Sequence, residues 1–254
     1  MIRKFLLPLS VLLLAFIVFP APHVLAQGTT GIPGVSLSVT PTSNPQATVS
    51  AVQVIVLLTV LSIAPSILVL MTSFTRIVVV LSFVRSALSV QQAPPNQVLV
   101  GLALFLTFFI MTPTFNAVNQ NALQPYLSGR ITQTQALNKA ELPFKEFMAK
   151  QTRIDDVELF LQYRHEMTPK SLVSLPISTL VPAFAISELK TAFQMGFMIY
   201  IPFLVIDLVV ATTLMSMGMM MLPPTMISLP FKLLLFVMAN GWYLVVKSLL
   251  AGFH

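Results

Sequence analysis

Charged residues are scarce in this sequence of 254 residues, and cysteine is absent. Asp, Glu, Lys and Arg together make up 9% of the chain, whereas a soluble domain carries about 25%. Hydrophobic residues make up 56%, so we expect a lipid bilayer to be part of the solvent. The net charge of +6 is not gathered into a basic run, which argues against nucleic-acid binding. The absence of cysteine excludes disulfides, thiolate metal sites and cysteine nucleophiles.

Residues suited to catalysis or to metal binding are also few. The three histidines are scattered, and no predicted helix carries two of them at metal-ligand spacing. The sequence contains no Gly-rich phosphate loop and no Gly-x-Ser-x-Gly motif. The acids Asp155, Asp156 and Glu158 are predicted to lie on the solvated face of an amphipathic helix. We therefore expect no enzyme activity, no cofactor and no metal site.

The first 26 residues have the three parts of a secretory signal. Arg3 and Lys4 form the charged start, and Phe5–Phe19 is an apolar core that is short for a membrane span. Small residues three positions and one position before the cleaved bond are typical of signal-peptidase sites, and they predict cleavage between Ala26 and Gln27. The alternative is an uncleaved first membrane anchor.

The remaining chain divides by composition into four parts. Residues 27–47 are rich in Gly, Pro, Ser and Thr, which predicts a flexible linker. Residues 48–115 and 191–254 are each predicted to form a hydrophobic helical hairpin, on either side of a polar, partly helical region at 116–190. Four apolar stretches near or above the length of about 20 residues that crosses a bilayer make up the hairpins: Val49–Met71, Gln97–Phe115, Thr191–Leu222 and Met226–Phe253. We therefore predict an all-α membrane protein.

The distribution of charge predicts the orientation of these helices. The segment 72–95 holds Arg76 and Arg85 and no acid, so the positive-inside rule places it in the cytoplasm. The polar region carries eight Lys or Arg and seven Asp or Glu, and we expect it on the periplasmic side. Within it, Leu142–Tyr163 mixes apolar and charged residues at helical spacing, which predicts amphipathic helices packed against neighbours.

Four charged residues lie within apolar surroundings: Asp207, Lys232, Arg76 and Arg85. An ionised carboxylate at bilayer depth is costly, so Asp207 must be protonated, paired or exposed to water. One interpretation is a residue of a transport pathway, and the other is a buried partner of Lys232 or of an arginine. Arg85 lies nine positions after Arg76, so the two side chains point to opposite faces of a helix. They either contact other protein or snorkel to lipid headgroups.

A cluster of methionines coincides with a helix break. Met219, Met220 and Met221 lie between Gly218 and Pro223-Pro224, which cannot continue a regular helix. Non-helical backbone between apolar helices must be buried in protein or line a cavity. Methionine adapts to varied surfaces, so these side chains are either a seal or ordinary apolar filling.

Several motifs resemble the FliP family of flagellar export proteins and cover roughly residues 48–252. They are FTR at 74–76, APPNQVL at 93–99, PAFAISELKTAFQMGF at 182–197, IPFLVID at 201–207, GMMMLPP at 218–224 and LPFKL at 229–233. The residues that carry this signature are Pro182, Phe184, Ser187, Glu188, Phe193, Gly196, Pro223, Pro224, Pro230 and Phe231.

The resemblance implies a core subunit of a type III export gate in the bacterial inner membrane and flagellar basal body. In that family several copies assemble with FliQ and FliR, near other membrane proteins of the export apparatus, and unfolded flagellar proteins pass through the centre. The methionines that match Met219, Met220 and Met221 form a gasket that closes the pore. The hairpins of the family stand partly above the bilayer plane. Injectisome relatives, the SctR family, share these motifs, but the signal peptide favours the flagellar branch.

Without the resemblance, two other functions fit the sequence. A secondary transporter with broken helices would need several polar residues that converge on one small-molecule site, whereas a single acid, Asp207, lies in the apolar segments. A purely structural membrane scaffold is the third possibility. Conductance of the purified complex would separate a pore from a scaffold.

Overall fold

The computed structural model describes residues 45–90, 93–167, 169–219 and 221–253. The predicted signal segment and its cleavage site between Ala26 and Gln27 lie outside these residues, as do residues 27–44 of the predicted linker and Met220. The chain divides into two compact units, with the boundary between Val56 and Leu57 inside helix α2 (Pro45–Leu70). Everything discussed below belongs to the second unit.

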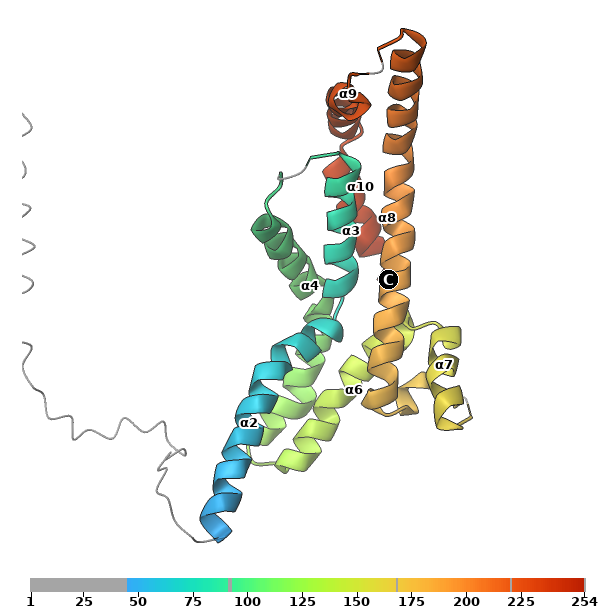
Figure 1. The fold of residues 1–254 in the computed structure, drawn as a ribbon. Helices are drawn as coiled ribbons and strands as arrows, with labels where there is room; N and C mark the ends of the chain where they lie inside the picture. Colours follow the sequence, from blue (N-terminus) through green and yellow to red (C-terminus); the bar gives the residue numbers. More distant parts are fainter. Residues whose placement is uncertain (1–44, 91–92, 168, 220, 254) are drawn as a thin grey trace, which may run out of the picture. The chain divides into compact units, whose positions relative to one another are not determined.

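The described residues form helices and turns, with no strand among them, so the prediction of an all-α protein is confirmed. The elements after α2 run as follows: α3 (Phe74–Ala87), α4 (Asn96–Val118), the π-helix η2 (Asn119–Leu123), α5 (Gln124–Leu127), α6 (Gln133–Gln151), α7 (Ile154–Arg164), the 3₁₀-helix η3 (Leu172–Ser174), α8 (Ile177–Ser216), α9 (Pro224–Met238) and α10 (Gly241–Ala251). Figure 1 gives their labels.

Two continuous helical stretches of the described chain are long and apolar enough to cross a membrane, Asn96–Leu127 and Ile177–Ser216. The second of them, α8, is one unbroken helix of 40 residues (Figure 1). It begins at Ile177, well before the apolar stretch expected from Thr191. Pro176 precedes it with a fixed φ of −66°, which suits the start of a helix.

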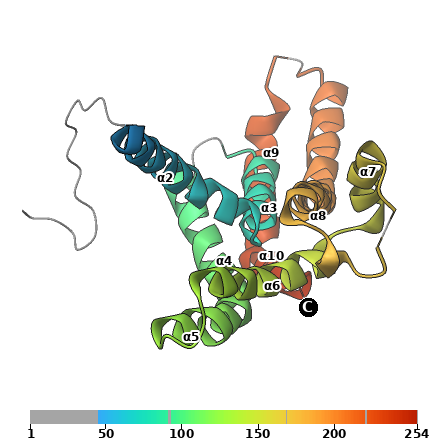
Figure 2. The ribbon, with the colours of Figure 1, turned by 90° about the horizontal axis from the view of Figure 1, so that it is seen from below.

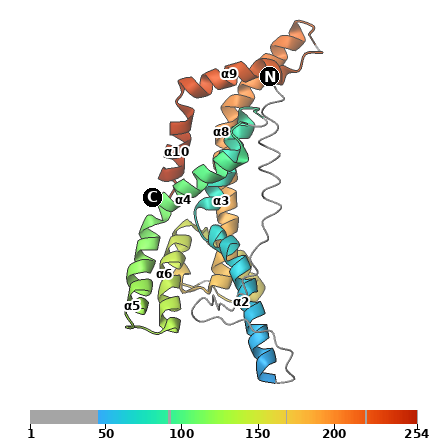
Figure 3. The same cartoon turned by 90° about the vertical axis from the view of Figure 1, so that its left-hand side faces the viewer.

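The predicted helix Met226–Phe253 is wrong as a single element. The chain forms α9 and α10 instead, which meet at a bend of 62° (Figure 3). Asn240 adopts a left-handed conformation with φ of +50° at the break, which Asn tolerates better than most residues. Gly241 follows, and a Cβ there would lie 2.3 Å from the Phe236 ring. An Asn-Gly pair is typical of turns, and the sequence-based prediction overlooked it here.

Two hydrophobic cores hold the second unit together, and α8 contributes to both. The first core joins α3 and α4 to the middle of α8, from Ala192 to Phe203, and to α9 and α10; Leu81, Ala103, Phe203 and Phe236 are among its buried members. The second core joins α6 and α7 to the first half of α8. Figure 2 shows the arrangement of these helices from below. The amphipathic helices expected over 142–163 are therefore present as α6 and α7.

The packing of α3 on α8 is close because Gly196 lies at the contact. A Cβ added to Gly196 would lie 2.5 Å from the Phe83 ring, so only glycine fits without a shift. Phe83 also meets Phe193 edge to face, with ring centroids 5.3 Å apart. This explains why two signature residues, Gly196 and Phe193, occupy that face of α8.

Candidate functional site

The loop between α8 and α9 contains the methionine cluster and has defined ends. The N–H of Met219 donates to the carbonyl of Leu214 over 3.0 Å, and the N–H of Gly218 donates to that of Met215 over 3.0 Å. Together with the φ of +73° at Gly218, these bonds form a Schellman motif, which ends a helix cleanly. On the other side Pro223 and Pro224 start α9, at positions where a missing N–H costs nothing.

The described methionines of this loop do not pack into either of the two hydrophobic cores. Met219 is 43% exposed and Met221 is fully exposed, and Met215, Met217 and Met226 are 60–70% exposed. Met220 lies outside the described residues. So many exposed long apolar side chains at one place indicate a contact with other molecules.

Asp207 and Lys232 form an ion pair close to the loop. The Lys232 Nζ lies 2.6 Å from the Asp207 Oδ2, and the Ser228 hydroxyl donates to the Asp207 Oδ1 over 2.6 Å. The ammonium also donates to the hydroxyl of Ser89 over 2.6 Å, so the cluster joins α8 and α9 to the turn after α3. The Lys232 side chain is fully buried, and that of Asp207 is 28% exposed.

This geometry agrees with the second interpretation of Asp207, a partner of Lys232. Both carboxylate oxygens already accept hydrogen bonds from protein groups. The carboxylate is therefore not held ready for a small-molecule substrate, which weakens the transporter alternative. Ser89 and Ser228 were not predicted as partners; Ser89 has a φ of +57°, which the sequence does not signal.

Arg76 is the centre of a second buried cluster. Its guanidinium makes a two-pronged pair with Glu188 of α8, in which Nε lies 2.8 Å from Oε2 and Nη2 bonds to Oε1. It also donates to the carbonyl of Gly252 over 2.8 Å and to the amide oxygen of Gln151 over 3.0 Å. Its carbon Cζ lies 3.9 Å from the centre of the Phe253 ring. One side chain thus joins α3, α6, α8 and the end of the chain.

Arg85, by contrast, is partly exposed and bonds to the side chain of Asn96 at the start of α4. The two arginines therefore contact different groups. Arg76 contacts other parts of the protein, as the first of the two interpretations expects, and does not snorkel to lipid headgroups. Its pairing with Glu188 was not predicted. The sequence did contain a signal for it. Glu188 lies among the apolar residues of the family motif, and a buried acid needs a cation as its partner.

Asp156 corrects one prediction from the sequence. Asp155 is exposed, but Asp156 is only 8% exposed and is not part of a solvated face. Its Oδ2 accepts the hydroxyl of Ser187 over 2.6 Å, and Ser187 also accepts the backbone N–H of Arg153 over 3.0 Å. The neighbouring signature residues Ser187 and Glu188 thus bind α7 and α3 on two sides of α8.

The other signature residues differ in burial. Phe184 is fully buried in the second core, whereas Phe193 and Phe231 are 56% exposed. Among the described residues, no group of three His, Asp or Glu is arranged to hold a metal ion. The arrangement that stands out is therefore two buried ion pairs on α8 and an exposed apolar loop at its end.

Comparisons with known proteins agree with the motifs. The model of the FliP family matches residues 57–249. A flagellar biosynthetic protein FliP of Bacillus subtilis is 64% identical over 211 residues, which cover 83% of this chain and 96% of the relative. Proteins of the same name from Aquifex aeolicus and Pectobacterium carotovorum are 50% and 48% identical, over 81% and 94% of this chain and 87% and 90% of their own lengths.

Proposed function

Because the chain belongs to the FliP family, and is therefore a component of the flagellar export apparatus, we propose that it is a pore-forming subunit of the export gate. Several copies, together with FliQ-like and FliR-like subunits, surround a channel for unfolded flagellar proteins in the inner membrane. The chain is a multi-pass protein of the flagellar basal body, and it is cleaved between Ala26 and Gln27. Further membrane proteins of the export apparatus adjoin it.

The exposed methionine loop is the observation that supports this proposal. Met219 and Met221 are held between a Schellman motif and a pair of prolines, yet among the described residues Met219 is 43% exposed and Met221 is fully exposed. A rigidly ended loop that presents adaptable apolar side chains suits a gasket formed by several copies. Such a gasket closes around polypeptides of any sequence and keeps ions out when the channel is idle.

The pair of Asp207 and Lys232 supports the same role. The pair joins α8 to α9, the two helices on either side of the loop. Asp207 lies about 15 Å before Met217 along the axis of α8. A buried ion pair restricts how the two helices can shift, because separation leaves a charge without a partner. We infer that the pair fixes the base of the loop while the methionine side chains remain free to adapt.

The test combines assembly with leakage. Met219, Met220 and Met221 are changed together to Ala in the full chain, and the complex is purified with its partner subunits. We expect assembly to be retained, because the side chains of Met219 and Met221 fill no packed core, in which each loss would cost about 2–5 kcal/mol. We expect ion or dye leakage to rise, because the gasket becomes too short to close.

Met167 provides the matched control, because it is 94% exposed in a loop far along the chain from the cluster. Met167→Ala should change neither assembly nor leakage. A triple variant that assembles normally and leaks no more than the unchanged complex would refute the gasket. If the triple variant loses its partners instead, the methionines are assembly contacts, which also contradicts the proposal.

A further inference from the structure

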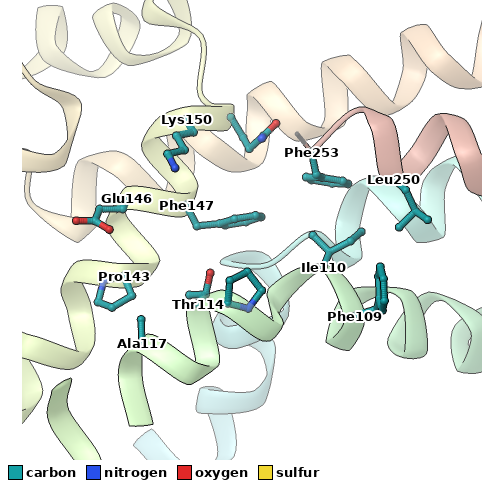
Figure 4. A pocket seen from close by; sticks show the side chains of 12 residues that line it. Phe109, Ile110, Thr114, Ala117, Pro143, Glu146, Phe147, Lys150, Leu250 and Phe253 are labelled. Carbon is teal, nitrogen blue, oxygen red and sulfur yellow. The ribbon is translucent and has the colours of Figure 1, made fainter. Parts of the chain in front are cut away.

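A pocket of about 490 Å³ lies between α4, α6 and the end of the chain, a volume within the range of about 300–1,000 Å³ usual for ligand sites. Its apolar end is formed by Phe109 and Ile110 of α4 and by Leu250 and Phe253. Figure 4 shows Glu146 and Lys150 of α6 at the opposite end from Phe109 and Leu250.

The buried Arg76 cluster holds one wall of this pocket in place. Arg76 binds the amide of Gln151 and lies over the ring of Phe253, and both of these residues line the pocket. The Phe253 ring in turn stacks on Phe147, with centroids 6.2 Å apart and planes at 19°. Phe147 also meets the buried Phe184 at 5.9 Å. The pocket is therefore preformed rather than a gap between mobile side chains.

The two charged residues at its rim are not paired with each other. Glu146 and Lys150 stand one helical turn apart, in the order that favours an ion pair. No ion pair or hydrogen bond joins either side chain to another group among the described residues, whereas Lys145 on the same helix pairs with Glu141 at 3.3 Å. The pocket thus offers one free anion and one free cation beside an apolar cleft.

The surroundings indicate where a ligand would come from. The pocket opens on α4, part of a helical stretch long and apolar enough to cross a membrane, and Phe105, Phe108 and Phe109 of that helix are 60–77% exposed. The rim belongs to α6, which places the charged residues Glu146 and Lys150 there. A ligand at this junction needs an apolar tail and a charged head.

We propose that this pocket binds a phospholipid with an ethanolamine headgroup. The phosphate pairs with Lys150, the primary ammonium donates to Glu146, and one acyl chain lies against Phe109, Ile110 and Leu250. A glycerol headgroup leaves Glu146 facing an anionic lipid, and a choline headgroup has no N–H to donate. The two opposite charges therefore select the ethanolamine headgroup from the other two.

The experiment uses the full chain, purified with its partner subunits and placed in nanodiscs. The probes are phosphatidylethanolamine and phosphatidylglycerol, each with the same photoreactive group midway along one acyl chain. Mass spectrometry then maps the labelled peptides. We expect the ethanolamine probe to label the peptides that contain Phe109 and Leu250, more strongly than the glycerol probe.

Variants of the rim separate this site from general contact with lipid. Lys150→Gln should lower labelling by the ethanolamine probe about two- to fivefold. This is the change in affinity that corresponds to losing an exposed ion pair worth up to about 1 kcal/mol. Glu146→Gln should reduce the preference for ethanolamine over glycerol. Lys145→Gln is the matched control on α6, since Lys145 does not line the pocket, and it should change nothing.

Two results would overturn the proposal. Labelling that is the same for both probes and for all variants would mean ordinary lipid around the helices. The second result concerns protein as the occupant: the chain has no cysteine, so Ala117→Cys places a single thiol in the pocket. If a thiol-reactive photo-cross-linker attached to that cysteine links it to another copy or to a partner subunit, the pocket is a protein interface and not a lipid site.

Discussion

Lys232 is expected to depend on Asp207 more strongly than any exposed lysine depends on its neighbours. Its side chain is fully buried, and its ammonium is satisfied by Asp207 and Ser89. Asp207→Ala removes the only carboxylate of that cluster and leaves a buried cation. Breaking a buried pair in this way costs about 3–5 kcal/mol, because the ammonium keeps its desolvation penalty and loses its partner.

The double variant Asp207→Ala with Lys232→Met should recover most of that loss. It removes both charges and replaces the lysine with an apolar side chain of similar length, which is often neutral or stabilising. Asp207→Asn should cost less than Asp207→Ala, because the amide oxygen can still accept from Ser228. The expected coupling between the two sites is therefore at least about 2 kcal/mol, well above the additivity error of about 0.5 kcal/mol.

The assay is unfolding of the detergent-purified protein, carried out on both single variants, the double variant and the unchanged chain. Lys247→Met is the control, since Lys247 is an exposed lysine of α10, and it should stay within about 0.5 kcal/mol. Secretion of flagellar proteins by the same four strains shows whether function follows stability. If the single losses simply add in the double variant, Asp207 and Lys232 are not a functional pair in the protein and the reasoning fails.

Three other changes test the rest of the structure. Arg76→Met should lower the free energy of unfolding by about 3–5 kcal/mol in the same assay, because it leaves Glu188 buried without a cation. Unchanged stability would contradict the pairing of Arg76 with Glu188. The same substitution at the exposed Arg130 is the control. Gly196→Ala should lower the free energy of unfolding by about 1–3 kcal/mol, because the added methyl group overpacks against Phe83. Adding Phe83→Ala should recover part of this loss. The intact mass of the membrane-extracted chain should lack the first 26 residues, and a mass that retains them would make that segment an anchor.

Composition and the length of the apolar stretches were enough for the class of fold, because a continuous apolar run of about 20 residues crosses a bilayer as a helix that satisfies its own backbone hydrogen bonds. The ends of the elements were harder. The start of α8 at Ile177 was missed because Glu188 and Lys190 made the preceding residues look like part of the polar region, whereas both charges find partners in the fold. The break between α9 and α10 was missed although Asn240-Gly241 marks it.

The charged residues of the candidate site could be named from the sequence, but their partners could be named only in part. Lys232 was foreseen as one possible partner of Asp207, since both lie in the same apolar hairpin. Arg76 and Glu188 are 112 residues apart, and no local pattern relates positions so distant. Their pairing depends on how α3 packs along α8, which Gly196 and Phe83 determine through side-chain contact.

The two ion pairs together limit how α8 can move. Glu188 and Asp207 are about 28 Å apart along that helix, and their cations come from α3 and α9 respectively. If α8 slid along either neighbour by one turn, a buried charge would lose its partner at one level or at both, at a cost of several kcal/mol each. The loop beyond Ser216 carries no such constraint, because the side chains of Met219 and Met221 are exposed. For the proposed export gate, the least costly way to admit a passenger is therefore a rearrangement of the methionine side chains and of the contacts between copies, with α3, α8 and α9 kept as one rigid body.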